Sequence, residues 1–208
     1  MVVESAQILY VVDPMCSWCW GFRRVLDEVI PQCAEGVGLQ LVMGGLAPDS
    51  DAPMDDDTRG YVQENWRAVA ERTGAIFNHD FWTKCHPRRS TYPACRAVMI
   101  ADQEGLGCAM LAAIQRAYYL EARNPSDIAT LAELADALGL DPDKFTRALA
   151  SAATQERLEG DFHLRRQLGA RSFPSLGLEV AGERRLLTSG WIDTEPLLGL
   201  LGAEGLLA

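Results

Sequence analysis

The spacing of apolar residues divides the chain into strand and helix candidates. Residues 8–12 form an unbroken apolar run rich in β-forming side chains, which predicts a central strand buried on both faces. From Ser17 the apolar residues recur at three- and four-residue steps, the period of one helical face, until Pro31. Residues 38–43 predict a second strand. A strand, a helix and a strand in this order indicate a βαβ unit with parallel strands and a right-handed crossover.

The middle of the chain carries the period of helices. It follows a loop rich in aspartate and proline at 47–57, and it contains no strand-like alternation as far as residue 168. Capping residues, glycines and prolines mark the predicted boundaries. The first predicted helix is 58–72, and the second is capped by Ser90 or Thr91 and has Pro93 in its first turn. A third, 110–122, follows Gly105 and Gly107, and a fourth, 127–138, is capped by Ser126 and ended by Gly139. The last begins at Asp141 and Pro142, continues in one or two pieces to Leu168, and is ended by Gly169.

The last forty residues return to a strand pattern. Residues 175–180 and 184–188 are short strand candidates joined by a glycine-containing turn, and 194–201 predict a closing helix. Because strands are expected only near the two ends, we predict an α/β domain built from residues 1–57 and 169–208. Residues 58–168 then form a helical domain inserted into it.

Composition and charge exclude several kinds of partner. The 208 residues are 48% hydrophobic and 23% charged, which fits a folded domain, and the formal net charge is −10. An acid excess argues against nucleic acid and anionic membranes. No apolar run approaches the roughly 20 residues of a membrane span. The first seven residues hold no lysine or arginine, and the run at 8–12 is too short for a signal peptide, so we expect a cytoplasmic protein.

One cysteine pair stands out among six cysteines. Cys16 and Cys19 follow the predicted strand and open the predicted helix, which is the context of a redox C-x-x-C motif. Helical spacing brings the two sulfurs within disulfide reach. At a helix N-terminus, free backbone N–H groups and the helix dipole stabilise a thiolate on Cys16, while Cys19, one turn further, is better placed to resolve a mixed disulfide.

A metal-binding or purely structural role for the pair has less support from the sequence. A zinc site needs four ligands, and no second C-x-x-C or histidine pair follows at regular spacing. A structural disulfide is not expected in the cytosol. Chance pairing of two core cysteines stays open. The remaining cysteines (Cys33, Cys85, Cys95 and Cys108) are interpreted as small apolar residues, and His79, His86 and His163 as surface or core groups.

Three segments together resemble a known family. They are residues 13–22 (DPMCSWCWGF), 90–97 (STYPACRA) and 171–175 (RSFPS). They are similar to DsbA-type thioredoxin-fold proteins, in particular the cytosolic FrnE-like branch of predicted protein-disulfide isomerases. The resemblance covers nearly the whole chain, including the helical block. It implies a thioredoxin-like fold with a helical insertion.

The resemblance also implies roles for individual residues. Cys16 would be the nucleophile, Cys19 the resolving thiol and Pro174 a cis-proline beside them, so that the backbone of Phe173 pairs with substrate. Trp18 would present an aromatic surface near the thiol. The expected activity is that of a thiol–disulfide oxidoreductase or protein-disulfide isomerase. It would need no cofactor or metal, and it would act on protein or small-molecule disulfides and thiols, glutathione among them.

The sequence departs from strongly oxidising members of that family. The dipeptide between the cysteines, Ser17 and Trp18, contains no histidine, and Asp13 and the net charge oppose a thiolate. A very oxidising potential is therefore not expected.

Two other functions remain open. Kappa-class glutathione transferases and hydroxychromene-carboxylate isomerases share the fold with a helical insertion, but they use a serine and no second cysteine, so Cys19 counts against them. Some cytosolic DsbA-like proteins are adaptors for a protease, in which the C-x-x-C senses redox state. The sequence does not separate the adaptor from the enzyme.

Overall fold

A four-stranded sheet forms the centre of the computed structural model, which describes residues 6–208. The strands are β1 (Ala6–Val12), β2 (Val37–Met43), β3 (Ser175–Val180) and β4 (Glu183–Ser189), and they lie in the order β2-β1-β3-β4. β1 pairs with β2 in parallel, and β3 pairs with β1 and β4 in antiparallel fashion. The first five residues of the predicted α/β domain lie outside the described part.

The prediction that β1 is buried on both faces is confirmed. Ile8, Tyr10 and Val12 point into the large hydrophobic cluster on one face of the sheet. Leu9 and Val11 point to the other face, where they join a smaller cluster that includes Leu168 at the end of the helix formed by residues 152–168. A strand without a solvated face needs apolar side chains at every position, which is the pattern seen in the sequence.

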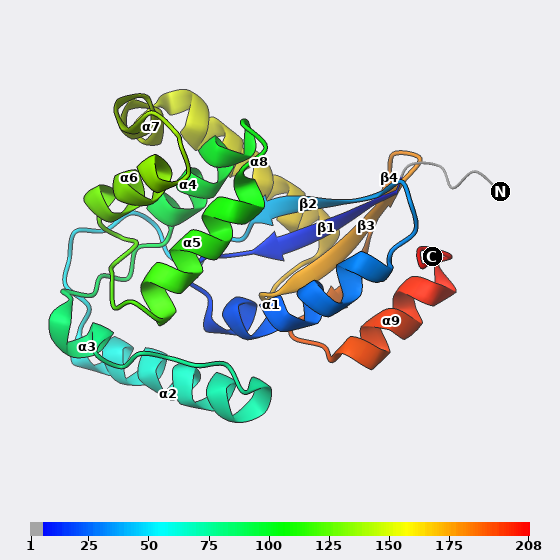
Figure 1. Ribbon diagram of the computed structural model, residues 1–208, viewed down its shortest axis with the longest axis horizontal. Helices are drawn as coiled ribbons and strands as arrows, with labels where there is room; N and C mark the ends of the chain where they lie inside the picture. The colour runs from blue at the N-terminus through cyan, green and yellow to red at the C-terminus, as the bar shows by residue number, and fades with distance from the viewer. Residues whose placement is uncertain (1–5) are drawn as a thin grey trace.

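Helices cover both faces of the sheet (Figure 1). α1 (Ser17–Val29), followed by a short 3₁₀ turn (Ile30–Gln32), lies beside α9 (Thr194–Ala203) on one face, and α8 (Ala152–Leu168) crosses the other. β1, α1 and β2 therefore form the predicted βαβ unit. The last two strands form a hairpin whose turn residues, Ala181 and Gly182, both have positive φ, 52° and 82°.

Between β2 and β3 the described chain holds helices and their connecting loops, and no strand of five residues, as predicted. Its other helices are α2 (Asp56–Thr73), α3 (Phe81–Lys84), α4 (Tyr92–Asp102), α5 (Gly107–Tyr119), α6 (Ile128–Ala137) and α7 (Pro142–Leu149). One hydrophobic cluster runs from the sheet through this block and includes Ile8, Trp66, Ile114 and Leu158. The insertion and the sheet therefore share a core.

Some capping predictions were right and others wrong. Asp141 caps α7, accepting hydrogen bonds from the backbone of Asp143 and Lys144, as expected. Ser126 does not cap α6, which begins at Ile128 after Asp127. Its hydroxyl donates instead to the Ser90 carbonyl at 2.7 Å.

The first turn of α4 is also built differently from the prediction. Thr91 occupies the N-cap position of α4, but its hydroxyl makes no capping bond; it is turned towards Asp13. The helix α3 was not predicted at all, because four residues are too few to show a period. None of the helices within residues 6–208 is long and apolar enough to cross a membrane.

Candidate active site

Cys16 lies at the end of the turn that connects β1 to α1. The chain leaves the sheet at Val12 and turns tightly, with the Cys16 N–H donating to the Asp13 carbonyl at 3.0 Å. Cys16 is the N-cap residue of α1, in an extended conformation, and its side chain caps none of the first N–H groups. These N–H groups stay free, so the positive end of the helix dipole stands at the sulfur.

Cys19 lies one helical turn further and is enclosed. Its residue exposure is 0%, against 7% for Cys16, and both are free thiols. Burial, followed by its interaction with the Cys16 thiol, raises the pKa of Cys19 well above its usual value. The two thiols are therefore unequal: solvent reaches only Cys16, and Cys19 favours its protonated form.

Phe173 and Pro174 reach the same place from the other end of the chain. The Cys16 Sγ lies 3.7 Å from the Phe173 carbonyl oxygen, and the Phe173–Pro174 peptide bond is cis. The Phe173 ring lies against Gly44, where an added Cβ would stand 2.6 Å from a ring carbon. The absence of a side chain at residue 44 thus lets the ring approach the end of β2.

The two tryptophans of the motif have different surroundings. Trp20 stacks on Tyr119 of α5 with a centroid distance of 5.5 Å, and its indole N–H donates to the Ile76 carbonyl at 3.1 Å. Trp20 therefore ties the first turn of α1 to the inserted helices. Trp18 is half-buried beside the large core cluster and keeps part of its side chain at the surface.

A buried carboxylate, which the sequence analysis treated only as a nearby negative charge, organises the loops around the cysteines. Asp13 is 0% exposed. One oxygen accepts the Met15 N–H at 2.8 Å; the other accepts the Leu46 N–H and the Thr91 hydroxyl, both at 2.7 Å. The Cys95 thiol also donates to it, at 3.6 Å. Asp13 thus joins the α1 turn, the loop after β2 and the start of α4.

The electrostatics of this network follow from its burial. Burial raises the pKa of Asp13, although the hydrogen bonds that it accepts oppose the shift. Burial, then the Asp13 charge, raises the pKa of Cys95 well above its usual value, so this thiol stays protonated and acts as a donor. The sequence feature that could have pointed to these two contacts with Asp13 is the four-residue spacing of Thr91 and Cys95, which places both on one side of the start of α4.

Within residues 6–208, no three histidine, cysteine or acidic side chains are grouped so that they could hold a metal ion. Of the histidines, His79 packs against the Trp66 ring with a centroid distance of 5.8 Å.

The sheet, the insertion and the unequal thiol pair define a thioredoxin-fold protein with a C-x-x-C dithiol. The family model of the DSBA-like thioredoxin domain matches residues 7–190, and the chain belongs to that family. The chain is 31% identical to the cytosolic disulfide reductase DsbM from Pseudomonas aeruginosa, with a TM-score of 0.73, 96% of this chain and 97% of DsbM being covered. DsbM has also been solved with GSH.

A second solved structure is similar over the same length. It is a protein from Nitrosomonas europaea, provisionally assigned as a protein disulfide isomerase; the identity is 29%, the TM-score 0.85, and 96% of this chain and 97% of that one are covered. The family and these neighbours support thiol–disulfide oxidoreductase chemistry and confirm the predicted thioredoxin-like fold.

Some relatives of the chain are known as adapter proteins and not as oxidoreductases. The ClpXP adapter protein SpxH of Bacillus subtilis is 25% identical over 177 residues, 83% of this chain. The matched region is 58% of the length of SpxH, so the chain spans less than two thirds of that relative.

Proposed function

We propose that the protein exchanges disulfides through Cys16 as the nucleophile and Cys19 as the resolving thiol. The observation that carries the proposal is the asymmetry of the pair: Cys16, at the N-terminus of α1, keeps 7% of its surface exposed, while Cys19, one turn away, keeps none. An exchange cycle needs one thiol that solvent and substrate can reach and a second that only an intramolecular disulfide can meet.

The cycle balances without a bound cofactor. The Cys16 thiolate attacks one sulfur of a substrate disulfide, forms a mixed disulfide and expels the other sulfur as a thiolate. Cys19 then gives up its proton and attacks the Cys16 sulfur, which releases the second substrate thiolate and leaves a Cys16–Cys19 disulfide. The substrate gains two electrons. Two molecules of an external thiol return the dithiol to its reduced form and become a disulfide themselves.

Phe173 and Trp18 are the proposed substrate contacts. The Phe173 carbonyl lies next to the Cys16 sulfur, at the approach to β3, where an extended substrate backbone could pair with it. Trp18 offers a partly exposed ring on the first turn of α1. We infer that glutathione is one of the thiols that reduce the pair, in the cytosol, which the likeness to DsbM supports.

Trapping of the mixed disulfide tests these roles. With glutathione disulfide as the probe, Cys19→Ser should accumulate a glutathione adduct on Cys16, because the resolving step is lost. Cys16→Ser should form none at Cys19. Cys33→Ser, outside α1, is the matched control and should turn over like the wild type. Peptide mapping by mass spectrometry locates the adduct, and an adduct on Cys19 in Cys16→Ser would reverse the two roles.

The likeness to the ClpXP adapter protein SpxH favours a second candidate, an adaptor that presents another protein to a protease. An adaptor holds its client through surface contacts, so a variant with both Cys16 and Cys19 replaced by serine should still bind it. An exchange enzyme loses turnover with the same variant. A titration of the reduction potential against glutathione buffer then distinguishes a reductase from an isomerase or an oxidant.

A further inference from the structure

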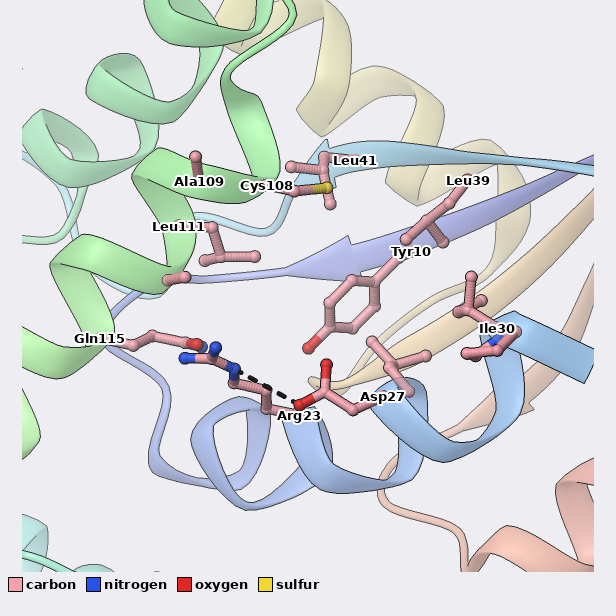
Figure 2. A pocket seen from close by; sticks show the side chains of 13 residues that line it. Tyr10, Arg23, Asp27, Ile30, Leu39, Leu41, Cys108, Ala109, Leu111 and Gln115 are labelled. Carbon is pink, nitrogen blue, oxygen red and sulfur yellow. Dashed lines mark ion pairs between the residues drawn. The ribbon is translucent and has the colours of Figure 1, made fainter. Parts of the chain in front are cut away.

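A groove separate from the Cys16 surface lies between α1, α5 and the face of the sheet (Figure 2). Its volume is about 480 Å³. That size falls in the range of about 300–1,000 Å³ of small-molecule sites. Most of its walls are aliphatic and come from three elements: Leu26 and Ile30 from α1 and its end, Leu39 and Leu41 from β2, and Leu111 from α5.

Two polar side chains, Gln115 and Tyr10, are among the residues that line this mainly apolar groove. Gln115 of α5 is 2% exposed, yet its amide makes no hydrogen bond with any other residue in the described part of the chain. Tyr10 of β1 is equally buried; burial, followed by the nearby Cys19 and Cys16 thiols, raises the pKa of its hydroxyl, which therefore stays protonated. The Gln115 amide is not sealed away from the groove, so it is available to hydrogen-bond a molecule that enters there.

The charged groups at the groove cancel one another. Arg23 and Asp27, one turn apart on α1, form an ion pair of 3.7 Å at the edge (Figure 2). The groove therefore offers aliphatic walls and a hydrogen-bonding amide without a net charge. Such a lining suits an uncharged molecule and disfavours an anion or a cation, which would leave its own charge poorly solvated.

We propose that this groove binds a small uncharged molecule with an apolar body and one carbonyl or amide head, and that Gln115 recognises the head. The primary amide of Gln115 can donate to a carbonyl oxygen and accept from an N–H. The apolar body then covers Leu39 and Leu41, which β2 leaves half-buried. This inference goes beyond the proposed function, and it holds whatever role the cysteine pair has.

Prodan, a neutral aromatic ketone whose emission reports polarity, is a suitable probe. We expect saturable binding with one site per chain and a blue shift of the emission. Leu39→Lys should weaken binding at least about tenfold, because it places a charge in the apolar wall. Leu200→Lys, which makes the same change at an exposed leucine of α9, is the matched control and should bind like the wild type.

Gln115→Leu tests the head group separately. It keeps the size of the side chain and removes the hydrogen bond, so we expect an affinity loss of about five- to tenfold. Thermal unfolding of each variant checks that the fold is intact. Prodan that does not saturate, or that binds Leu39→Lys as tightly as Leu200→Lys, would show adsorption only and overturn the proposal.

Cys108 gives a second readout that does not depend on fluorescence. This exposed cysteine of α5 lines the groove, whereas Cys85 lies outside it. Saturating prodan should slow alkylation of Cys108 by a bulky maleimide several-fold and leave Cys85 unchanged. Equal alkylation with and without prodan would place the probe elsewhere on the molecule and would also overturn the proposal.

Discussion

Replacing Asp161 with asparagine should change how stability depends on pH. Asp161 lies on α8, and one of its carboxylate oxygens accepts the Met43 N–H, at the end of β2, at 2.7 Å. Burial raises the pKa of Asp161 to about 6, more than the Met43 hydrogen bond and the charge of Arg157 lower it. The folded chain therefore holds a proton on this carboxyl at pH values where the unfolded chain has released it.

The sign and the size follow from the linkage of proton binding to folding. Because the pKa is raised by folding, the stabilising contribution is complete below about pH 3.8 and is lost as the pH rises through about 6. A gap of about two pH units is worth about 3 kcal/mol. Asparagine keeps an oxygen for the Met43 N–H and does not ionise, so the variant does not lose this contribution.

Urea unfolding followed by tryptophan fluorescence provides the assay. From pH 4 to pH 7, the free energy of unfolding of Asp161→Asn, relative to the wild type, should increase by about 2–3 kcal/mol. The exposed Asp136→Asn corrects for the loss of one carboxylate. A relative stability that stays constant, or that decreases with pH, would show that the folded chain stabilises the charged form, and the reasoning from burial would be refuted.

Three further outcomes are expected. Brief alkylation at neutral pH should label Cys16 before the enclosed Cys19, as peptide mapping by mass spectrometry will show; the reverse order would contradict the assignment of the nucleophile. Gly44→Ala should destabilise the chain by about 1–3 kcal/mol in urea unfolding and slow disulfide exchange, because its Cβ would collide with the Phe173 ring. Asp13→Asn should reduce stability by about 2–4 kcal/mol in the same assay, since either orientation of the amide turns an NH₂ group towards a backbone N–H; an unchanged midpoint would refute the network.

Local patterns in the sequence predicted most of the fold. β1 was recognisable because all its side chains from Ile8 to Val12 are buried, and α7 because Asp141 and Pro142 are a strong start signal. The strands near the ends of the chain and the helices between them followed from the change of period. The C-x-x-C pair was found because a thiol at the start of a helix has a chemical reason to be there.

Long-range polar contacts were not predictable in the same way. Thr91 was interpreted as a helix cap because the helix begins beside it, yet its hydroxyl donates a hydrogen bond to Asp13, which lies 78 positions away in the sequence. Ser126 was read as a cap for the same reason and instead bonds the Ser90 carbonyl. In both cases the hydroxyl donates to an acceptor that is distant in the sequence, and this bond turns it away from the local backbone N–H groups that it would cap. A single sequence does not reveal which acceptor is near.

These long-range contacts also connect the inserted helices to the loops around Cys16. Thr91 and Cys95 from α4 bind the carboxylate of Asp13, which holds the turn before Cys16. From α8, Arg165 donates to the Gly44 carbonyl and lies over the Phe173 ring, with 5.3 Å from its guanidinium carbon to the ring centroid. The thiols lie at the start of α1 and the Phe173 carbonyl lies just before β3, while side chains from the insertion hold the neighbouring loops. The geometry around Cys16 therefore depends on α4 and α8 as much as on its own helix.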